Sequence, residues 1–170
     1  MLRKAKSTEI EKIMSIIEDG VKFLKQQGIN QWQHGSPGCS DVENDIKQGT
    51  SYVYELDGEI VGTAMLNTYD ADYEKYPTLW SSCNNYLVIH RLAIKEECRS
   101  QGVGHKFMND IILFAKENNV EYIRIDTHKD NKIMRKYLRK NGFKELDEIK
   151  LSMKNISDDK ERTAYELKIE

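Results

Sequence analysis

The stretch from Tyr86 to Thr127 constrains the fold more than any other part of the sequence. An apolar run over Tyr86–Ile94 predicts a buried strand, and apolar residues at helical spacing predict a helix over 102–118. Another apolar run predicts a second strand over Val120–Thr127. Two strands joined by a helical connection of this length favour a parallel pair with a right-handed crossover.

The first part of the chain contains a long helical pattern that begins near Ile10 and ends near Gly28. We interpret Gly20, inside this pattern, as a break between two helices. Thr8–Glu11 and Ser40–Glu43 have the form of capping boxes, and the second predicts a short helix that ends near Gly49.

Strands over 50–56 and 59–68 are predicted because Asp57-Gly58 between them is a strong hairpin signal. Hairpins produce antiparallel neighbours, so the whole sheet should be mixed. The remaining predicted elements are a strand near Leu2–Ala5, a basic amphipathic helix over Asn131–Lys140, and strands over 143–151 and 163–169.

Composition excludes several classes of protein. The 170 residues are 39% hydrophobic and 32% charged, with a net charge of −2, which fits a globular domain and gives no reason to expect nucleic acid or an acidic membrane as partner. No apolar run approaches the roughly 20 residues that span a bilayer. The N-terminus turns polar where a signal peptide needs an apolar stretch. We expect a single domain over residues 1–170, in the cytoplasm.

Cysteine and histidine positions give no indication of a metal site. Cys39, Cys83 and Cys98 are odd in number and lack metal-ligand spacing, and the 4 histidines are scattered. We expect reduced thiols and no metal. Cys98 as a nucleophile is less favoured than a structural thiol, because no base is paired with it in the sequence.

The segment Arg99-Ser100-Gln101-Gly102-Val103-Gly104 lies between a predicted strand and a predicted helix. Glycines permit a tight turn, and the free N–H groups and dipole of the following helix favour an anion such as a pyrophosphate. Arg99, His105 and Lys106 can add positive charge. The alternative is an ordinary glycine turn with solvated basic residues.

Two other glycine motifs fit the segment poorly. A dinucleotide-binding G-x-G-x-x-G would need a third glycine where Phe107 stands, and a larger parallel sheet, although Asp126 lies where the ribose acid would. A kinase-type P-loop would need Lys-Ser/Thr directly after Gly104.

Two separately placed motifs stand out in the second half of the sequence. The first is Leu92-Ala93-Ile94 followed by Arg99-x-x-Gly102-x-Gly104, and the second is Asn131 followed by Asn141-Gly142-Phe143. Together they resemble the acetyl-CoA-binding core of GCN5-related N-acetyltransferases (GNAT). The resemblance covers roughly residues 50–150. It implies an α/β (α+β) fold whose mixed, mostly antiparallel sheet has a central parallel pair and helices on both faces.

The resemblance also implies a division of labour, with residues 86–143 as the acetyl-CoA-binding core and 1–50 and 69–84 as the acceptor side. A backbone N–H near Leu92 would stabilise the oxyanion, and acetyl transfer to an amine would be direct. The coenzyme-binding residues would be Leu92, Ala93, Ile94, Arg99, Ser100, Gln101, Gly102, Val103, Gly104, His105, Lys106 and Asn131.

One position departs from the family pattern. The tyrosine that is the family's frequent acid for the leaving thiolate falls on Leu138, with Tyr137 adjacent. Consecutive helical residues diverge by about 100°, so Tyr137 is not an automatic substitute. A thiol of pKa about 8.5 leaves as thiolate at pH 7 at a cost of only roughly 2 kcal/mol, so the reaction tolerates a missing acid.

The acceptor side contains two aromatic-rich stretches. Trp32 lies in a loop between Gly28 and Gly38, and Tyr76 and Trp80 follow the third strand. Together with His128 they are candidates for binding the acceptor, although packing under loops is the alternative for each of them. The acceptor is expected to be a small-molecule or peptide amine of open identity, and a homodimer is compatible with the sequence.

His90 is the candidate base that deprotonates the acceptor amine. Strand alternation places it on the face of Leu92, unless a bulge intervenes. A neutral histidine suits this task near pH 7. A histidine hydrogen-bonded beneath the sheet is the competing interpretation, and His128 is the alternate base.

Two other function classes stay open. A non-catalytic acyl-CoA-binding module with the same fold is favoured by Leu138. The basic helix over Asn131–Lys140 could bind nucleic acid, although a solvated basic face in a net acidic chain is the simpler interpretation.

Overall fold

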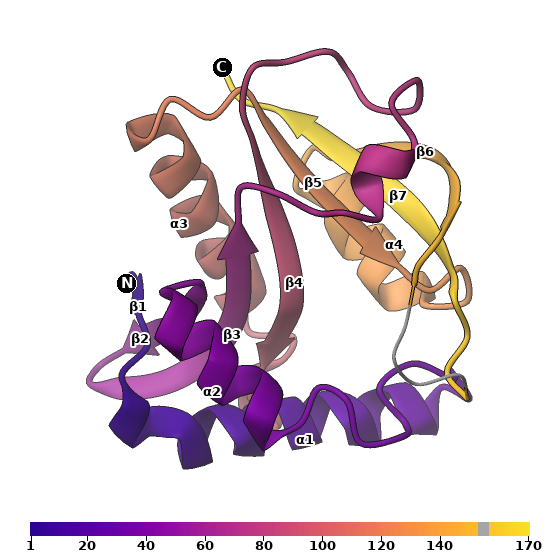
Figure 1. Ribbon diagram of the computed structural model, residues 1–170. Helices are drawn as coiled ribbons and strands as arrows, with labels where there is room; N and C mark the ends of the chain where they lie inside the picture. Colours follow the sequence, from indigo (N-terminus) through magenta and orange to yellow (C-terminus); the bar gives the residue numbers. More distant parts are fainter. Residues whose placement is uncertain (153–156) are drawn as a thin grey trace.

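The computed structural model describes residues 1–152 and 157–170. Within them seven strands form one sheet in the order β1-β2-β3-β4-β5-β7-β6 (Figure 1). The strands are β1 (Leu2–Lys4), β2 (Ser51–Leu56), β3 (Glu59–Asn67), β4 (Tyr86–Ile94), β5 (Tyr122–Thr127), β6 (Lys144–Lys150) and β7 (Glu161–Lys168). Neighbouring strands are antiparallel except for the parallel pair β4 and β5. The expected fold class is confirmed.

Helices cover both faces of this sheet (Figure 1). On one face lie α1 (Ile10–Gln26) and α2 (Cys39–Gln48), and on the other α3 (Val103–Glu117) and α4 (Lys132–Lys140). The short 3₁₀ turns are η1 (Ser7–Glu9), η2 (Tyr73–Lys75) and η3 (Glu96–Cys98). Apart from the predicted break at Gly20, the helices and strands agree with the sequence prediction to within a few residues at their ends.

Buried side chains gather on both faces of the sheet. Phe107 and Ile111 of α3 pack against Ile89 and Ile123 of the central strands. On the opposite face, α1 and α2 cover β2 and β3. The connection between β3 and β4, with η2, crosses in front of β5 and β7 (Figure 1), and its buried Tyr73 and Trp80 form a third cluster there.

The predicted helix break at Gly20 is wrong, because α1 continues without interruption from Ile10 to Gln26. A Cβ at Gly20 would lie 2.9 Å from Cζ3 of Trp32 and 3.7 Å from Cβ of Ala93. The glycine therefore lets the indole ring approach the helix closely, and the signal came from packing rather than from chain direction.

The two predicted capping boxes are also displaced. The Glu9 carboxylate accepts the N–H of Lys6 at 2.8 Å, and the Asp41 carboxylate accepts the N–H of Gly38 at 2.7 Å. Both helical segments therefore begin earlier than Thr8 and Ser40 suggest. The end of α2 at Gly49, in the left-handed conformation (φ 72°), is as predicted.

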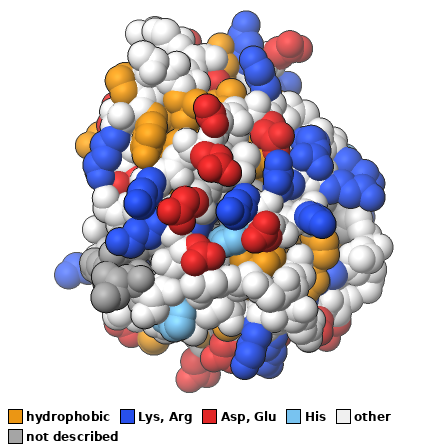
Figure 2. Space-filling model, turned by 90° about the vertical axis from the view of Figure 1, so that its right-hand side faces the viewer, with side chains coloured by type: hydrophobic (Ala, Val, Ile, Leu, Met, Phe, Trp, Pro, Cys, Tyr) orange, Lys and Arg blue, Asp and Glu red, His pale blue; other side chains and the backbone are white. Residues whose placement is uncertain are grey.

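β6 forms one edge of the sheet and carries charges of both signs. Its exposed side chains include Lys144, Glu145, Glu148 and Lys150. Basic and acidic side chains are interspersed on this side of the molecule (Figure 2). Mixed charge on an edge strand opposes pairing with a further strand.

Candidate functional site

β4 and β5 separate in the middle of the sheet. Their ladder joins only Tyr86–Val88 to Tyr122–Arg124, although β4 continues to Ile94 and β5 to Thr127. Figure 1 shows the two strands close together at one end and diverging toward the other. The second half of β4 therefore has an edge that no strand of the described chain pairs with, which can accept an extended ligand.

A β-bulge changes the direction of the side chains and backbone groups of β4 at this edge. Met65 pairs with His90 and Thr63 with Ala93, so Arg91 and Leu92 both stand opposite Ala64. Arg91 adopts φ 51°, in the left-handed region. Lys95 donates its N–H to Val61 on β3. By alternation along the strand, the N–H groups of Leu92 and Ile94 point away from β3, into the gap.

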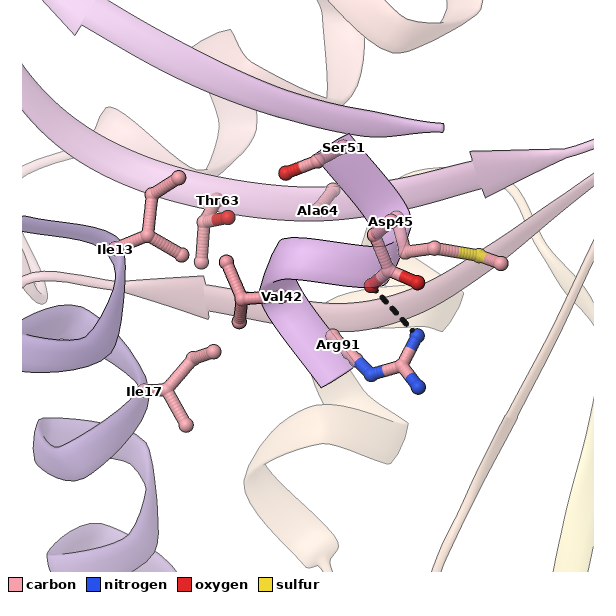
Figure 3. A pocket seen from close by; sticks show the side chains of 9 residues that line it. Ile13, Ile17, Val42, Asp45, Ser51, Thr63, Ala64 and Arg91 are labelled. Atoms are coloured by element: carbon pink, nitrogen blue, oxygen red, sulfur yellow. Dashed lines mark hydrogen bonds and ion pairs between the residues drawn. The ribbon is translucent and has the colours of Figure 1, made fainter. Parts of the chain in front are cut away.

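An ion pair holds the bulge from the side of α2. Nη1 of Arg91 lies 2.8 Å from Oδ2 of Asp45 (Figure 3), and burial raises the pKa of Asp45. The cavity beside the pair is lined by the side chains drawn in Figure 3, Ile13, Ile17 and Val42 among them, and measures about 10 Å³. That space is too small for a substrate, so the pair serves to fix the backbone.

The glycine segment forms the N-terminal turn of α3 as expected. Gly102 is the N-cap with φ 78°, and no side chain caps the first turn of α3. Ser100 is also left-handed, with φ 61°. The N–H groups of the first turn and the helix dipole therefore point toward an anion position.

This turn lies directly beside the β4 edge. A Cβ at Gly104 would come within 2.9 Å of Cδ1 of Ile94 and 3.2 Å of the Tyr137 ring. The hydroxyl of Tyr137 donates to the Gly104 carbonyl at 2.7 Å, and burial raises the pKa of this phenol far above its usual value. The structure thus brings together three sequence-predicted site residues, Ile94, Gly104 and Tyr137, and Tyr137 braces the turn.

Two of the basic side chains around the turn, those of Arg99 and His105, are engaged with other parts of the protein. Arg99 donates to the carbonyl of Asp19 at 2.9 Å and stacks over Phe23, with 4.3 Å to the ring centroid. His105 contacts Asn141 at 2.7 Å. Ser100, Gln101 and Lys106 are exposed, and Val103 is buried. Backbone amides, more than Arg99, therefore define the positive character of the turn.

α4 begins at Asn131, whose side chain accepts the N–H of Met134 at 3.1 Å. Asn131 is only 8% exposed, and Leu138 is fully buried in the cluster that includes Phe143. A contact of Asn131 with the coenzyme stays a prediction. Arg135 and Arg139 of the same helix lie within 2.7 Å and 3.5 Å of Glu145, so part of its basic face is paired.

The expectation that His90 shares the face of Leu92 is wrong, because the bulge inserts a residue between them. Leu92 packs against the cluster under α3 and α4. His90 lies on the opposite face, where Nε2 is 2.5 Å from Oδ2 of Asp70 and the ring is 5.7 Å from that of Tyr73.

His128, the alternate base, has both ring nitrogens engaged. Nε2 lies 2.8 Å from Oδ2 of Asp159, and Nδ1 accepts the N–H of Asp130 at 3.1 Å. The hydrogen bond from His128 holds the pKa of Asp159 below its usual value. The ring therefore fixes the segment before β7 and has no nitrogen left to accept a proton.

The predicted aromatic residues lie in different environments. Trp80 is 6% exposed, and its indole N–H donates to the carbonyl of Tyr73 at 3.0 Å. The Tyr76 hydroxyl accepts the N–H of Lys150 at 2.9 Å. Trp32 packs against α1 and Ala93. Trp80 and Tyr76 thus belong to the side of β6 and β7, whereas Trp32 lies near β4.

Sequence reasoning missed Asp70 and Asp45, which contact His90 and Arg91. Asp70 has a weak local signal, because an aspartate that begins a turn accepts backbone N–H groups. Asp45 has none, since its partner is 46 residues away.

No helix of residues 1–152 and 157–170 has the length and apolarity of a membrane span. The same residues contain no group of three or more histidine, cysteine or acidic side chains arranged for a metal. Cys98 and Cys83 are half-buried free thiols, and Cys39 is exposed.

Comparisons with known proteins indicate one family. The family model described as "Acetyltransferase (GNAT) family" matches residues 17–143. A GNAT acetyltransferase from Streptococcus agalactiae has 29% identity and a TM-score of 0.86, over 100% of this chain and 95% of that one. A search among curated proteins finds no match.

More distant structures share the fold. A Listeria monocytogenes GNAT acetyltransferase has 20% identity and a TM-score of 0.72, covering 99% of this chain and 94% of that one. A Salmonella typhimurium structure, described with its cofactor acetyl-CoA, has 14% identity and a TM-score of 0.71. The match covers 100% of this chain and 94% of that one. The family model matches residues 17–143, which are more than half of this chain. The chain therefore belongs to the GNAT acetyltransferase family.

Proposed function

We propose that this GNAT protein is an N-acetyltransferase that transfers the acetyl group of acetyl-CoA directly to an amine in a ternary complex. One observation carries the proposal: the free edge of β4 at Leu92–Ile94 leads straight to the uncapped first turn of α3 at Gly102. An extended arm that ends in a pyrophosphate fits that continuous surface. The Salmonella structure described with acetyl-CoA supports the choice of co-substrate.

Backbone groups do most of the binding in this proposal. The pantetheine arm adds to β4 like a strand, along the edge that β5 leaves open after Val88. The pyrophosphate lies on the N–H groups that follow Gly102. Asn131, at the start of the neighbouring helix, contacts the coenzyme from the other side of the gap.

The reaction needs few side chains. Acetyl-CoA supplies a thioester, whose carbonyl oxygen gains charge when the amine attacks. The N–H of Leu92, turned into the gap by the bulge, stabilises that oxyanion. The nitrogen lone pair forms the C–N bond, and the C–S bond breaks with its electron pair on sulfur. One proton leaves the ammonium before attack, and a second passes from nitrogen to water as the amide forms.

His90 accepts the first proton. An alkyl amine of pKa about 10.4 must lose a proton before it is nucleophilic, at a cost of roughly 4.6 kcal/mol at pH 7. A positioned base offsets part of this. His90 precedes the bulge, and its side chain is 28% exposed on the face of α1 and α2. His128 is less suited, because both its nitrogens are engaged.

The thiolate leaves without a dedicated acid in this proposal. Leu138 occupies the family's usual tyrosine position and is buried, and the Tyr137 hydroxyl donates to Gly104. Departure of an unprotonated thiolate of pKa about 8.5 costs only roughly 2 kcal/mol at pH 7. Tyr137 is thus a brace of the coenzyme turn.

The acceptor side is formed by residues 1–50 and 69–84 of a single domain that spans residues 1–170. These segments supply Trp32, Asp45 and Asp70 around β4. We propose a small-molecule or peptide amine as the acceptor and the cytoplasm as the place of action.

The alternative function is that of an acyl-CoA-binding module that has lost turnover. The buried Leu138 favours it, since no acid side chain replaces the family's tyrosine. Such a module would bind acetyl-CoA through the same turn and release no thiol with any amine.

The deciding experiment measures free thiol released from acetyl-CoA over a panel of amines. The panel contains polyamines, free amino acids, peptides with a free N-terminus, and peptides with lysine as the only amine. Thiol release with stoichiometric amide product supports the enzyme. Calorimetric binding of coenzyme A without turnover on the whole panel supports the module, and absence of binding contradicts both.

A further inference from the structure

A carboxylate and an imidazole meet on the acceptor side of β4. Oδ2 of Asp70 lies 2.5 Å from Nε2 of His90, and the two side chains are 14% and 28% exposed. The residues come from different segments, since Asp70 belongs to the connection between β3 and β4. The fold, and not local sequence, creates this contact.

Asp70 is held in place independently of His90. Its other oxygen, Oδ1, accepts the N–H groups of Asp72 at 2.8 Å and Tyr73 at 3.0 Å, at the start of η2. Tyr73 is fully buried, packs against Trp80 with the two rings tilted, and donates its hydroxyl to Asp126 at 2.6 Å. A carboxylate fixed at one oxygen by a turn that the buried Tyr73 anchors presents the other oxygen in a constant direction.

Asp70 is ionised near neutral pH. Burial works to raise the pKa of its carboxyl group, but the hydrogen bond and charge of His90 and the two backbone N–H groups outweigh burial and hold the pKa below its usual value. An ionised carboxylate can only accept hydrogen bonds. The neutral imidazole must therefore carry its proton on Nε2, which leaves the lone pair on Nδ1.

Nδ1 of His90 is the nitrogen that remains for chemistry. No hydrogen bond to Nδ1 is present among residues 1–152 and 157–170, whereas His128 uses both of its nitrogens. The two histidines beside the gap thus differ in one chemical respect. Of these two rings, that of His90 combines a fixed proton on one nitrogen with an open lone pair on the other, and that of His128 does not.

The other charged groups near His90 form an ion pair with each other. Asp45 of α2 acts on His90 through its charge but is paired with Arg91 of β4 at 2.8 Å. η2 contributes the neutral ring of Tyr73. Asp70 is therefore the carboxylate whose charge is directed at the imidazole without a competing cation in contact.

We propose that Asp70 is a positioning residue for His90. It fixes the proton on Nε2, turns Nδ1 toward the acceptor amine, and stabilises the imidazolium that forms when Nδ1 takes the amine proton. This inference rests on the proposed function, in which His90 is the base. It adds a residue that acts through His90 and touches neither substrate.

The test compares Asp70→Asn with Asp72→Asn, a matched change in the same turn. Asp72 pairs with Lys75 at 2.8 Å and with the N–H of Ser152, away from His90. We expect Asp70→Asn to lower kcat at pH 7 at least about tenfold while KM for acetyl-CoA is unchanged. The midpoint of the rising limb of the pH–rate profile should move to lower pH, because the imidazolium loses its carboxylate. Asp72→Asn should keep the parent's midpoint.

The outcomes separate the inference from the proposed function. If the parent is active and His90→Gln is impaired, but Asp70→Asn keeps the parent's profile, the inference alone is overturned. If the parent binds coenzyme A and turns over no amine, the proposed function falls, and the inference with it. Should Asp70→Asn fail to fold, nitrogen NMR of the parent's imidazoles decides. The neutral Nε2–H form of His90 supports the inference, and the Nδ1–H form overturns it.

Discussion

The coenzyme side and the acceptor side of this protein are built on different principles. On the coenzyme side, the turn at Gly102 and the edge at Leu92–Ile94 offer backbone groups, so what matters there is chain conformation. On the acceptor side, Asp70 contacts His90 and Asp45 contacts Arg91, each through side chains from distant segments. The first kind of site leaves a local pattern in the sequence, and the second kind does not.

The same contrast predicts how each side tolerates substitution. A backbone site fails when a side chain or a charge enters the space its ligand needs, whereas conservative changes around it matter little. A side-chain site fails when one functional group is lost, and its failure depends on pH. Three substitutions test this difference and a fourth tests the packing at Gly20, and they follow from the largest expected effect to the smallest.

Gly102→Asp should abolish coenzyme binding and leave the fold intact. A carboxylate about 4 Å from a phosphate charge costs about 4 kcal/mol at an effective dielectric constant of about 20, roughly a thousandfold in affinity. Gly58→Asp is the matched control, since Gly58 has the same left-handed conformation (φ 80°) in the turn between β2 and β3 and equally open surroundings. Calorimetry in which both variants bind like the parent would place the coenzyme elsewhere.

His90→Gln should lower turnover at least about tenfold at pH 7 and keep the coenzyme affinity of the parent. The defect should shrink as the pH rises toward the amine pKa of about 10.4, because the acceptor then loses its proton without a base. The measurement is the ratio of variant to parent kcat across pH. A ratio that stays at one removes His90 from the mechanism.

Tyr137→Phe should lower turnover less than about tenfold, because the ring stays in place and the thiolate leaves readily. Loss of the hydrogen bond to Gly104 should lower the free energy of unfolding by about 1 kcal/mol. Denaturant unfolding and kinetics on the same samples check both parts. A thousandfold loss of kcat with unchanged coenzyme affinity would identify Tyr137 as the acid.

Gly20→Ala tests the packing explanation of the glycine in α1. Alanine gains about 1 kcal/mol of helix propensity, but its Cβ would lie 2.9 Å from Trp32, and such overpacking costs about 1–3 kcal/mol. We expect net destabilisation by about 1 kcal/mol in denaturant unfolding. In a Trp32→Leu background the same substitution should be neutral or stabilising, and equal destabilisation in both backgrounds would refute the contact.

The predictable part of the fold was the part that local pattern determines. Apolar periodicity and the Asp57-Gly58 turn located the strands and helices, and the glycines at 102 and 104 located the turn before α3. The predicted helix break at Gly20 was wrong because a glycine can make room for a neighbouring aromatic ring as well as permit a bend.

The bulge at Arg91 shows where prediction from sequence stops. The sequence Ile89–Ala93 contains no signal that predicts an inserted residue. The bulge nevertheless places His90 on the face of the sheet opposite to Leu92. The cause is the pairing of β4 with β3 and of Arg91 with Asp45 of α2, which are both contacts between distant segments. The side-chain contacts of the acceptor side therefore cannot be predicted from local sequence.

The central claim is that coenzyme A lies along the freed edge of β4 and on the first turn of α3. Backbone amide NMR during titration with acetyl-CoA tests it most directly. We predict the largest shifts at Leu92, Ile94 and the amides that follow Gly102, with little change in β1 and β2, and loss of these shifts in Gly102→Asp. Saturable binding whose shifts fall elsewhere, or that persists unchanged in the variant, would contradict the account.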